Sequence, residues 1–170
     1  MIAQRDAVVL RAARTDDLAA IDALTVAGYT PIQASFVEML GEDLYETVHA
    51  EPDRSWDERK IAQNRRLFAE HPEQVWVLED AGAVIGYVTF WLFRDKSYGH
   101  LDNSAVDVSR RGEGWASFMY GHVLGHFRAL GLRYAHVDTG LDDAHIPARR
   151  AYEAVGFDRA VPTVDLWQRL

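Results

Sequence analysis

A glycine-rich segment in front of a long helical stretch constrains the fold of this chain more than any other feature. The segment reads R-G-x-G-x-A and comprises Arg111, Gly112, Gly114 and Ala116, and residues 114–130 continue it with helical periodicity. Glycine lets the backbone turn tightly and approach a ligand, because it carries no Cβ. The free amides and positive dipole at the N-terminus of a helix attract anions, and the guanidinium of Arg111 adds donors for a diphosphate. The segment therefore predicts a phosphate-binding turn that leads into a helix.

Length and composition fit one cytoplasmic domain over residues 1–170. A chain of this length can form one substantial core, and it contains neither an apolar run long enough for a membrane span nor an N-terminal signal sequence. The net charge of −8 argues against nucleic acid as a partner, because phosphate backbones attract basic surfaces. The absence of cysteine excludes a thiol nucleophile and a cysteine zinc site. His122 and His126 have a spacing compatible with metal binding, but no obvious further ligands accompany them, so we expect no metal.

The order of the expected elements indicates an α+β domain with a mixed sheet. Residues 13–70 are helical, with one helix ending near Gly28, another beginning near Pro31 and a third starting at a capping box of Ser55 and Glu58. The expected strands are residues 8–12, 75–78, 83–93, 98–106, 133–138 and 161–167. The later helices are expected at residues 114–130 and 147–155. The three middle strands are joined by short turns and predict an antiparallel meander.

Glycines inside these elements predict local irregularities. Gly86 lies within a strand and indicates a bulge or a close backbone neighbour. Gly121 and Gly125 share one face of the helix at residues 114–130, where each costs about 1 kcal/mol relative to alanine. We therefore expect that these two glycines allow close packing against a neighbouring element.

Several segments, in this order, resemble the GNAT superfamily of N-acetyltransferases. Residues 78–90, LEDAGAVIGYVTF, resemble the second and third strands of that family. Residues 106–116, VDVSRRGEGWA, resemble its acetyl-CoA signature V-x-P-x-x-R-G-x-G-x-G/A, with Val108 in place of the frequent proline. Residues 148–157, ARRAYEAVGF, resemble the late motif A-x-x-L-Y-E-x-x-G-F. The helical segment before residue 75 occupies the place of the family's variable, substrate-facing helices.

The resemblance implies a mainly antiparallel central sheet flanked by helices, with a splayed pair of strands at the cofactor site. It also implies acetyl transfer from acetyl-CoA to a primary amine of a small molecule or peptide, by direct transfer. The pyrophosphate is then expected on the amides of residues 112–116, and the pantetheine arm along the strand at residues 98–106. The cofactor-binding residues implied in this way are Val106, Val108, Arg111, Gly112, Gly114, Trp115, Ala116, His145 and Tyr152.

Trp115 and His145 differ from the other members of this set. We expect the indole of Trp115 to pack in the core, so that only its backbone belongs to the phosphate site. His145 stands where the family commonly carries an asparagine that binds pantetheine or a water. It either replaces that asparagine as a donor or serves only as a neighbour of the helix cap.

Tyr152 is the expected proton donor, because the resembling family often uses a tyrosine at this place to protonate the departing thiolate of CoA. The alternative is a tyrosine that packs beside Phe157. A base must also take the proton of the amine, and strand alternation places His100, Asp102 and Ser104 on one face. Some family members carry a catalytic glutamate at the position of His100, so His100 or Asp102 is the candidate base.

Further polar residues could contribute to the site. His136 and Asp138 share a face of the next strand and could line the same cleft, and Tyr29, Glu38 and Trp56 are candidates for the acceptor pocket.

A dinucleotide-binding enzyme is disfavoured, because too few residues follow Asp138 for the remaining βαβ units. A catalytically silent, acyl-CoA-binding GNAT domain that acts as a sensor or assembly module stays open, and so does a homodimer.

Overall fold

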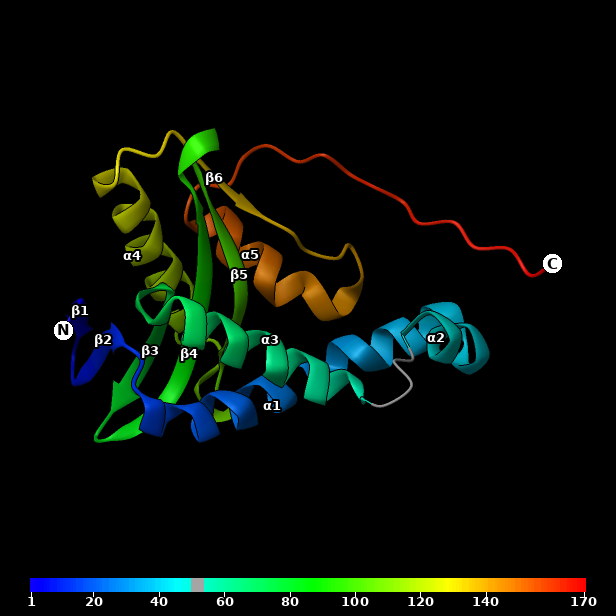
Figure 1. Ribbon diagram of the computed structural model, residues 1–170, viewed down its shortest axis with the longest axis horizontal. Coiled ribbons are helices and arrows are strands. Elements are labelled where there is room, and N and C mark those ends of the chain that lie inside the picture. The colour runs from blue at the N-terminus through cyan, green and yellow to red at the C-terminus, as the bar shows by residue number, and fades with distance from the viewer. Residues whose placement is uncertain (50–53) are drawn as a thin grey trace.

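The computed structural model describes residues 1–49 and 54–170 and shows a six-stranded sheet (Figure 1). The strands lie in the order β1-β2-β3-β4-β5-β6, and all neighbours are antiparallel except β5 and β6, which are parallel. The strands are β1 (Ala3–Arg5), β2 (Val8–Ala12), β3 (Val75–Asp80), β4 (Ala83–Phe93), β5 (Tyr98–Val106) and β6 (Tyr134–Val137). The expected mixed, mainly antiparallel sheet is confirmed, and β1 is an additional strand that the sequence pattern did not predict.

Helices cover both faces of this sheet (Figure 1). They are α1 (Leu18–Leu40), α2 (Glu42–His49), α3 (Trp56–Glu70), α4 (Trp115–Ala129) and α5 (Ile146–Ala154). Residues of α4 and α5 pack with Trp76 and Leu78 of β3 in one core, and residues of α1 and α3 pack with Val75 and Val77 in the other. Alternate side chains of β3 therefore point into opposite cores, which explains why the whole apolar run is buried.

One uninterrupted helix, α1, replaces the two helices expected on either side of Gly28 and Pro31. The expected break is wrong because Gly28 serves close packing: a Cβ there would lie 2.9 Å from the Cβ of Ala105 on β5. Pro31 is exposed and is accommodated within the helix. The helix ends at Gly41, whose φ of 75° favours glycine. As a result, α1 runs on past β5 and carries its later residues over the cavity described below.

The capping box predicted for α3 is confirmed. The carboxylate of Glu58 accepts a hydrogen bond from the backbone N–H of Ser55 at 2.9 Å, and the reciprocal contact to the Ser55 side chain is present. This cap begins α3 at Trp56. Lys60 and Asn64 then lie one helical turn apart, on the face that meets β5.

The prediction made for the strand glycine Gly86 is confirmed, whereas the prediction made for the helix glycines Gly121 and Gly125 is not. The register between β3 and β4 shifts beside Gly86, and a Cβ at Gly86 would lie 3.1 Å from the carbonyl oxygen of Ala105. The predicted bulge and close neighbour are both confirmed. The prediction for Gly121 and Gly125 is wrong, because a Cβ at either position would meet no neighbouring atom within 4 Å. Both glycines lie on the exposed side of α4.

A bulge in β5 overturns the expected alternation of polar side chains. The register of β4 and β5 shifts between Val88 and Phe90, which leaves one extra residue on β5. The backbone N–H of Asn103 donates to a threonine hydroxyl of β4 at 2.8 Å instead of to a carbonyl. Asp102 and Asn103 therefore both contact α3, whereas Ser104 contacts α4. The expectation that Asp102 and Ser104 share a face is wrong for this reason.

The strand expected at residues 161–167 is not formed. Figure 1 shows the chain after α5 leaving the body as an extended ribbon, and Val161 and Leu166 are each 89% exposed. A run of strand-forming residues becomes a strand only where another strand pairs with it, and the pattern alone cannot reveal such a partner. β6 consequently lies at the edge of the sheet, with Tyr134 at 62% exposure.

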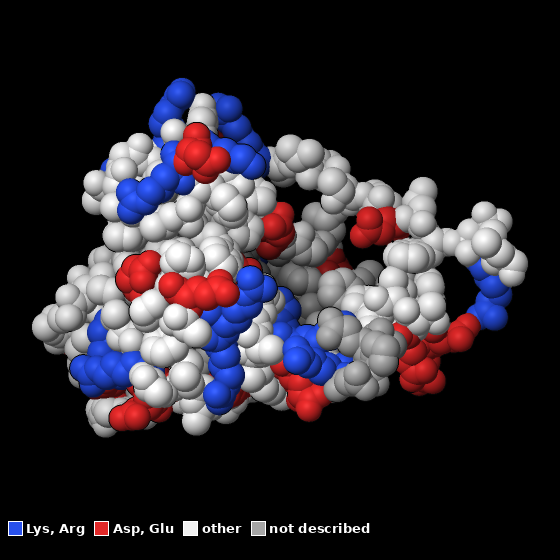
Figure 2. Space-filling view, viewed as in Figure 1, with Lys and Arg blue, Asp and Glu red and all other residues white. Residues whose placement is uncertain are grey.

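Charged side chains of both signs intermingle on the face drawn in Figure 2. The net charge of −8 is therefore not gathered into one acidic field there, and this face offers no continuous basic surface for a phosphate backbone. The absence of a nucleic-acid partner stays a prediction. Among the described residues, no helix has both the length and the apolar character needed to cross a membrane.

Candidate active site

A cavity of about 940 Å³ lies along β5 and is bordered by helices from both faces of the sheet. The predicted site residues that line it are His100, Asp102, Val106, Arg111, Gly112, Gly114, Trp115, Ala116, His145 and Tyr152. Val108 is outside this lining and is 57% exposed. Of the residues considered for the acceptor pocket, Tyr29 lines the cavity, whereas Glu38 and Trp56 do not. The structure thus brings nearly all of the predicted residues together.

The turn between β5 and α4 has the backbone form that a phosphate site requires. Gly112 and Gly114 have φ values of 81° and 80°, in the left-handed region that favours glycine. A Cβ at Gly112 would meet nothing within 4 Å, so the turn is uncrowded at this position. Arg110 and Arg111 both line the cavity; Arg110 is engaged with Asp80 at 2.6 Å, whereas Arg111 forms no ion pair with the described residues. Arg111 is therefore available to an anion.

Strand β1 supports this turn from behind. The guanidinium of Arg5 lies 3.4 Å from the ring centroid of Trp115 and donates to the carbonyl oxygen of Glu113 at 2.9 Å. Trp115 is 4% exposed, and its indole N–H donates to the Glu113 carboxylate at 2.7 Å. The indole packs in the core, as predicted, and so fixes the first residue of α4.

β5 and β6 separate along the cavity. Their paired residues run from Tyr98 and Tyr134 to Leu101 and Val137, and β5 then continues to Val106 without β6. Residues 102–106 consequently have no strand partner on that side within the described chain. Unpaired N–H and C=O groups of this kind can bind an extended ligand as an added strand. This separation is the splayed pair implied by the resemblance.

Tyr152 forms part of the cavity wall beside α4. It is 8% exposed, its ring stacks on that of Tyr120 at 5.0 Å, and its edge meets Phe157 at 5.9 Å. The hydroxyls of Tyr120 and Ser104 are 2.7 Å apart. Burial raises the pKa of Tyr152, and the neighbouring Tyr120 raises it further, so the phenol is protonated at neutral pH. Packing against Phe157 holds this phenol in place.

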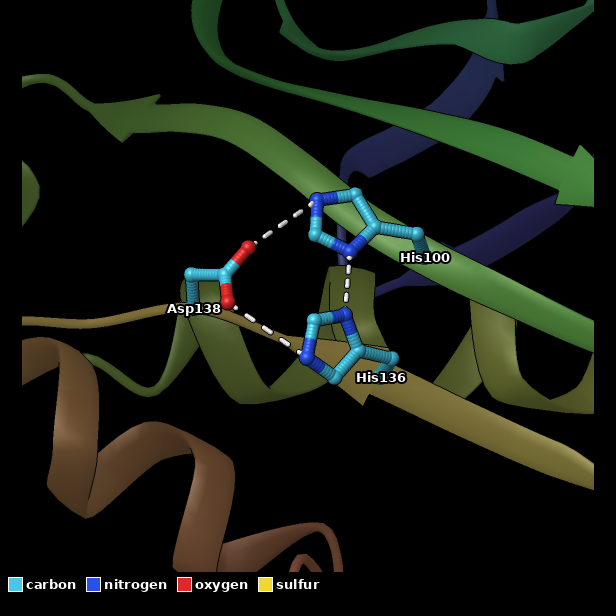
Figure 3. A group of neighbouring side chains, drawn as sticks. All are labelled: His100, His136 and Asp138. Carbon is cyan, nitrogen blue, oxygen red and sulfur yellow. Dashed lines mark hydrogen bonds and ion pairs between the residues drawn. The ribbon is translucent and has the colours of Figure 1, made fainter. Parts of the chain in front are cut away.

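His100, His136 and Asp138 form a connected polar group where β5 and β6 part (Figure 3). The two imidazole Nδ1 atoms are 2.8 Å apart, and the Asp138 carboxylate lies 3.8 Å from His100 Nε2 and 3.4 Å from His136 Nε2. Side-chain exposure rises from 17% at His100 to 53% at His136 and 79% at Asp138. Burial lowers the pKa of His100, against an opposing effect of Asp102, so His100 is neutral at neutral pH.

The same three residues offer metal-ligand atoms within 4.8 Å of one another. A 2.8 Å contact between two imidazole nitrogens, however, is a hydrogen bond that contains one proton. If both Nε2 atoms bound a metal, both Nδ1 atoms would carry protons and repel each other at this distance. The group is therefore better suited to passing a proton than to binding a metal.

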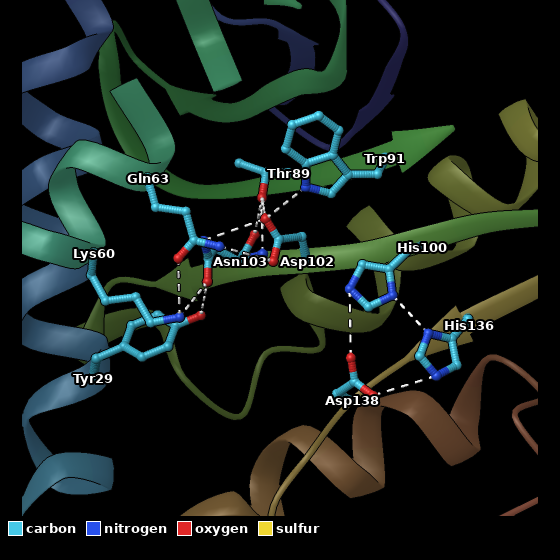
Figure 4. A network of polar contacts seen from close by, with 10 residues as sticks. All are labelled: Tyr29, Lys60, Gln63, Thr89, Trp91, His100, Asp102, Asn103, His136 and Asp138. Atoms are coloured by element: carbon cyan, nitrogen blue, oxygen red, sulfur yellow. Dashed lines mark hydrogen bonds and ion pairs between the residues drawn. The ribbon is translucent and has the colours of Figure 1, made fainter. Parts of the chain in front are cut away.

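The bulge of β5 sets up a second polar network (Figure 4). Asp102 Oδ2 accepts a hydrogen bond from the indole N–H of Trp91 at 3.2 Å. Asn103 Oδ1 accepts from the hydroxyl of Tyr29 and from the ammonium of Lys60, each at 3.0 Å. The side-chain amide nitrogen of Asn103 donates to the side-chain oxygen of Asn64 on α3 at 2.9 Å. Together these contacts tie the bulge to α1 and α3, and they place Lys60 at the cavity wall.

His145 is held by a carboxylate at the opposite side of the cavity. Its Nδ1 lies 2.5 Å from Asp142 Oδ1, and Asp142 Oδ2 accepts a hydrogen bond from Ser35 of α1 at 2.8 Å. These contacts connect the segment before α5 to α1. Because Asp142 engages Nδ1, the other ring nitrogen of His145 is left for a ligand.

Lys60, Asn103 and Tyr120 line the cavity, although the sequence interpretation did not select them. Tyr120 follows Ala116 by one helical turn, so helical spacing from the glycine segment could have found it. The sequence offers no comparable signal for Lys60, because the burial of Asn64 one turn later is a property of the fold. No sequence signal marks Asn103, because the bulge alone turns it toward α3.

The chain belongs to the acetyltransferase (GNAT) family, whose family model matches residues 35–157. It is 32% identical to the mycothiol acetyltransferase of Thermobispora bispora over a region that covers 70% of this chain and 48% of that protein. The chain thus spans about half the length of this curated relative.

Solved acetyltransferase structures share the fold. A possible acetyltransferase from Clostridium difficile 630 superposes with a TM-score of 0.64 at 13% identity, over 97% of this chain and 99% of that one. A GNAT family acetyltransferase from Brucella melitensis, solved in complex with acetyl-CoA, gives a TM-score of 0.59 at 20% identity, over 93% of each chain. At such identities the similarity establishes the fold and leaves the acceptor open.

Proposed function

We propose that this chain transfers the acetyl group of acetyl-CoA directly to the primary amine of a small molecule or peptide. The observation that carries the proposal is that one cavity joins the glycine turn, the unpaired edge of β5 and the side chains of Tyr152 and His100. Membership of the acetyltransferase family supports it. Direct transfer agrees with the absence of cysteine, which excludes a cysteine acyl-enzyme.

The chain offers a matching group for each part of acetyl-CoA. The amides of residues 112–116 and the guanidinium of Arg111 would hold the pyrophosphate at the start of α4. The unpaired edge of residues 102–106 would pair with the amides of the pantetheine arm. With the Nδ1–H of His145 donated to Asp142, its Nε2 would accept a hydrogen bond from an N–H group of the pantetheine arm. When bound, acetyl-CoA supplies a thioester whose acyl carbon accepts the amine and whose sulfur leaves.

His100 would act as the general base. In the tautomer in which His100 Nδ1–H donates to His136 Nδ1, the lone pair of His100 Nε2 would be left to take the proton of the amine. As Nε2 gains this proton, the Nδ1 proton can move to His136, where Asp138 stabilises the positive charge nearer to solvent. Asp102 is the weaker choice, since an imidazole has a higher ordinary pKa than a carboxylate and competes better for an amine proton.

Tyr152 would act as the general acid that protonates the departing sulfur. The new C–N bond forms as the C–S bond breaks, one proton leaves the amine at His100, and one proton reaches sulfur from Tyr152. Burial keeps Tyr152 protonated until the thiolate develops, and stacking on Tyr120 fixes the direction of its hydroxyl. The backbone amides near the splayed strands would polarise the thioester carbonyl.

Thermal unfolding with acetyl-CoA, CoA and NAD added separately tests the binding half of this proposal. A ligand at about 100 times its Kd adds roughly 2.7 kcal/mol to the free energy of unfolding. We expect both CoA species to raise the Tm and NAD to leave it unchanged. The matched variants Arg111→Gln and Arg128→Gln separate the site from general charge effects, because Arg128 is exposed on α4 and does not line the cavity. Stabilisation by NAD alone would overturn the assignment.

A further inference from the structure

Lys60 is a cation in the cavity that the proposed mechanism does not use. It projects from α3 toward the bulge of β5 and lines the cavity beside Tyr29 and Asn103 (Figure 4). Its hydrogen-bond acceptors are the amide oxygens Asn103 Oδ1 at 3.0 Å and Gln63 Oε1 at 3.5 Å. Over residues 1–49 and 54–170, no carboxylate lies within the 4.0 Å of an ion pair with it.

This environment leaves the charge of Lys60 incompletely compensated. An ammonium group has three N–H donors, and the described chain supplies two acceptors, one of them distant. Burial lowers the pKa of Lys60, and Asp102 opposes this effect from beyond ion-pair distance. The Asp102 carboxylate is itself engaged by Trp91 and Gln63. Holding a half-buried cation among mainly neutral partners destabilises the folded protein, unless an anionic ligand binds beside it.

The polar network holds Lys60 in this position. Asn103 Oδ1 accepts hydrogen bonds from Tyr29 and Lys60 together, and the Lys60 ammonium lies 4.8 Å from the centroid of the Tyr29 ring. The side chain is therefore oriented before any ligand binds. The adjacent cavity wall from α1 includes Ile32 and Phe36, which provide an apolar surface next to the cation.

We infer that Lys60 binds an anionic group of the acceptor, so that the acceptor is an amine that also carries a carboxylate. The inference rests on the proposed function for the identity of the reacting amine. The geometry assigns the amine to the side of His100 and the carboxylate to the side of Lys60, with an apolar portion of the acceptor against α1. The shared chemistry, an amine with a carboxylate, fits either a free amino acid or a peptide with an acidic side chain.

Matched acceptor pairs test this inference. The first pair is 5-aminopentanoate and its carboxamide, and the second is the dipeptide amide Gly-Glu-NH₂ and its neutral counterpart Gly-Gln-NH₂. We would measure kcat and KM for each with wild type, Lys60→Met, Lys60→Arg and the control Lys96→Met, which removes the same charge from an exposed turn outside the cavity. Calorimetric binding of the N-acetylated forms of all four compounds, in the presence of CoA, gives a readout that does not require turnover.

Wild type should favour the acidic member of at least one pair by about tenfold or more, chiefly through KM, as expected for a charge-assisted hydrogen bond. Lys60→Met should remove this preference and leave the neutral member within about twofold, while Lys60→Arg and Lys96→Met keep it. Preference within the first pair identifies a small-molecule carboxylate, and preference within the second identifies a peptide side chain.

Equal use of acidic and neutral acceptors by wild type would overturn the inference and leave the acetyltransferase function standing. The same holds if the acidic preference persists in Lys60→Met. If no amine is acetylated but the acidic N-acetyl compounds bind more tightly in a Lys60-dependent way, the anion site stands and the proposed function fails. Thermal unfolding of each variant distinguishes these results from loss of the fold.

Discussion

The phenol of Tyr152 is positioned and protonated by the same packing, so its hydroxyl should matter for chemistry more than for binding. We predict that Tyr152→Phe lowers kcat by about 100-fold, the scale of general acid catalysis, and leaves the Kd for acetyl-CoA nearly unchanged. The control is Tyr134→Phe, which removes a hydroxyl from an exposed residue of β6 outside the cavity. Steady-state kinetics and calorimetry measure the two effects, and an unchanged kcat in Tyr152→Phe would remove it from the mechanism.

The lowered pKa of His100 gives its proposed role a pH signature. A base works when it is deprotonated, so kcat/KM should fall as pH drops through the pKa of His100, which lies below the ordinary value of about 6.5. We predict that this acidic limb disappears in His100→Gln. A limb that persists in that variant would assign the base to another group, with Asp102 as the first candidate.

The two neighbours of His100 should move this acidic limb in opposite directions. His136 lowers the pKa of His100, so His136→Gln should shift the limb to higher pH. Asp138 raises the pKa of His100, so Asp138→Asn should shift the limb to lower pH. A kcat/KM profile over pH measures both shifts. A shift of the acidic limb in the same direction in both variants would contradict the arrangement of charges proposed for this group.

At the scale of residues, the sequence identified groups whose chemistry depends on local spacing. Arg111 and the adjacent glycines follow from the R-G-x-G pattern, and the structure places them at one cavity with Tyr152. The partners of Asp102 and Asn103 could not be predicted, because one inserted residue in β5 changes the faces of the strand. The roles of Arg111, the adjacent glycines and Tyr152 in binding and catalysis stay predictions.

At the scale of elements, the glycines at the start and in the middle of α4 should respond oppositely to alanine. Gly114→Ala places a side chain at a φ of 80°, so we predict a loss of about 1 kcal/mol of stability and weaker acetyl-CoA binding. Gly121→Ala should gain about 0.5–1 kcal/mol and leave binding unchanged, because a Cβ there meets no neighbour. Urea unfolding and calorimetry check both variants, and equal effects would contradict the distinction.

Element boundaries were predictable where a local signal sets them. The capping box of Ser55 and Glu58 correctly predicted the start of α3. The break at Gly28 was predicted wrongly, since this glycine is required by contact with Ala105, a residue far away in sequence. The expected strand at residues 161–167 failed for a related reason, because strand formation depends on a partner.

At the scale of the whole molecule, the order of elements predicted a mixed sheet but missed β1 and added a strand at residues 161–167, and the splayed strands at the cavity were implied by the family resemblance. A meander followed by a glycine turn and helix leads to a parallel fifth and sixth strand, and their separation opens β5 to a ligand. A single domain over residues 1–170, cytoplasmic location and a homodimer stay predictions. The identity of the acceptor was not predictable, because the side chains that would select it come together only through α1, α3 and the bulge of β5.

The most direct test of the account is a measurement of acetyl transfer by the wild-type chain saturated with acetyl-CoA. Free CoA and N-acetylated product would be quantified together by mass spectrometry over a panel of primary amines that includes the carboxylate-bearing pairs. We predict CoA and N-acetyl product in equal amounts with at least one amine, and about 100-fold slower formation of both in Tyr152→Phe. Tight binding of acetyl-CoA without product from any amine would contradict this prediction and would identify the chain as a silent acyl-CoA-binding domain.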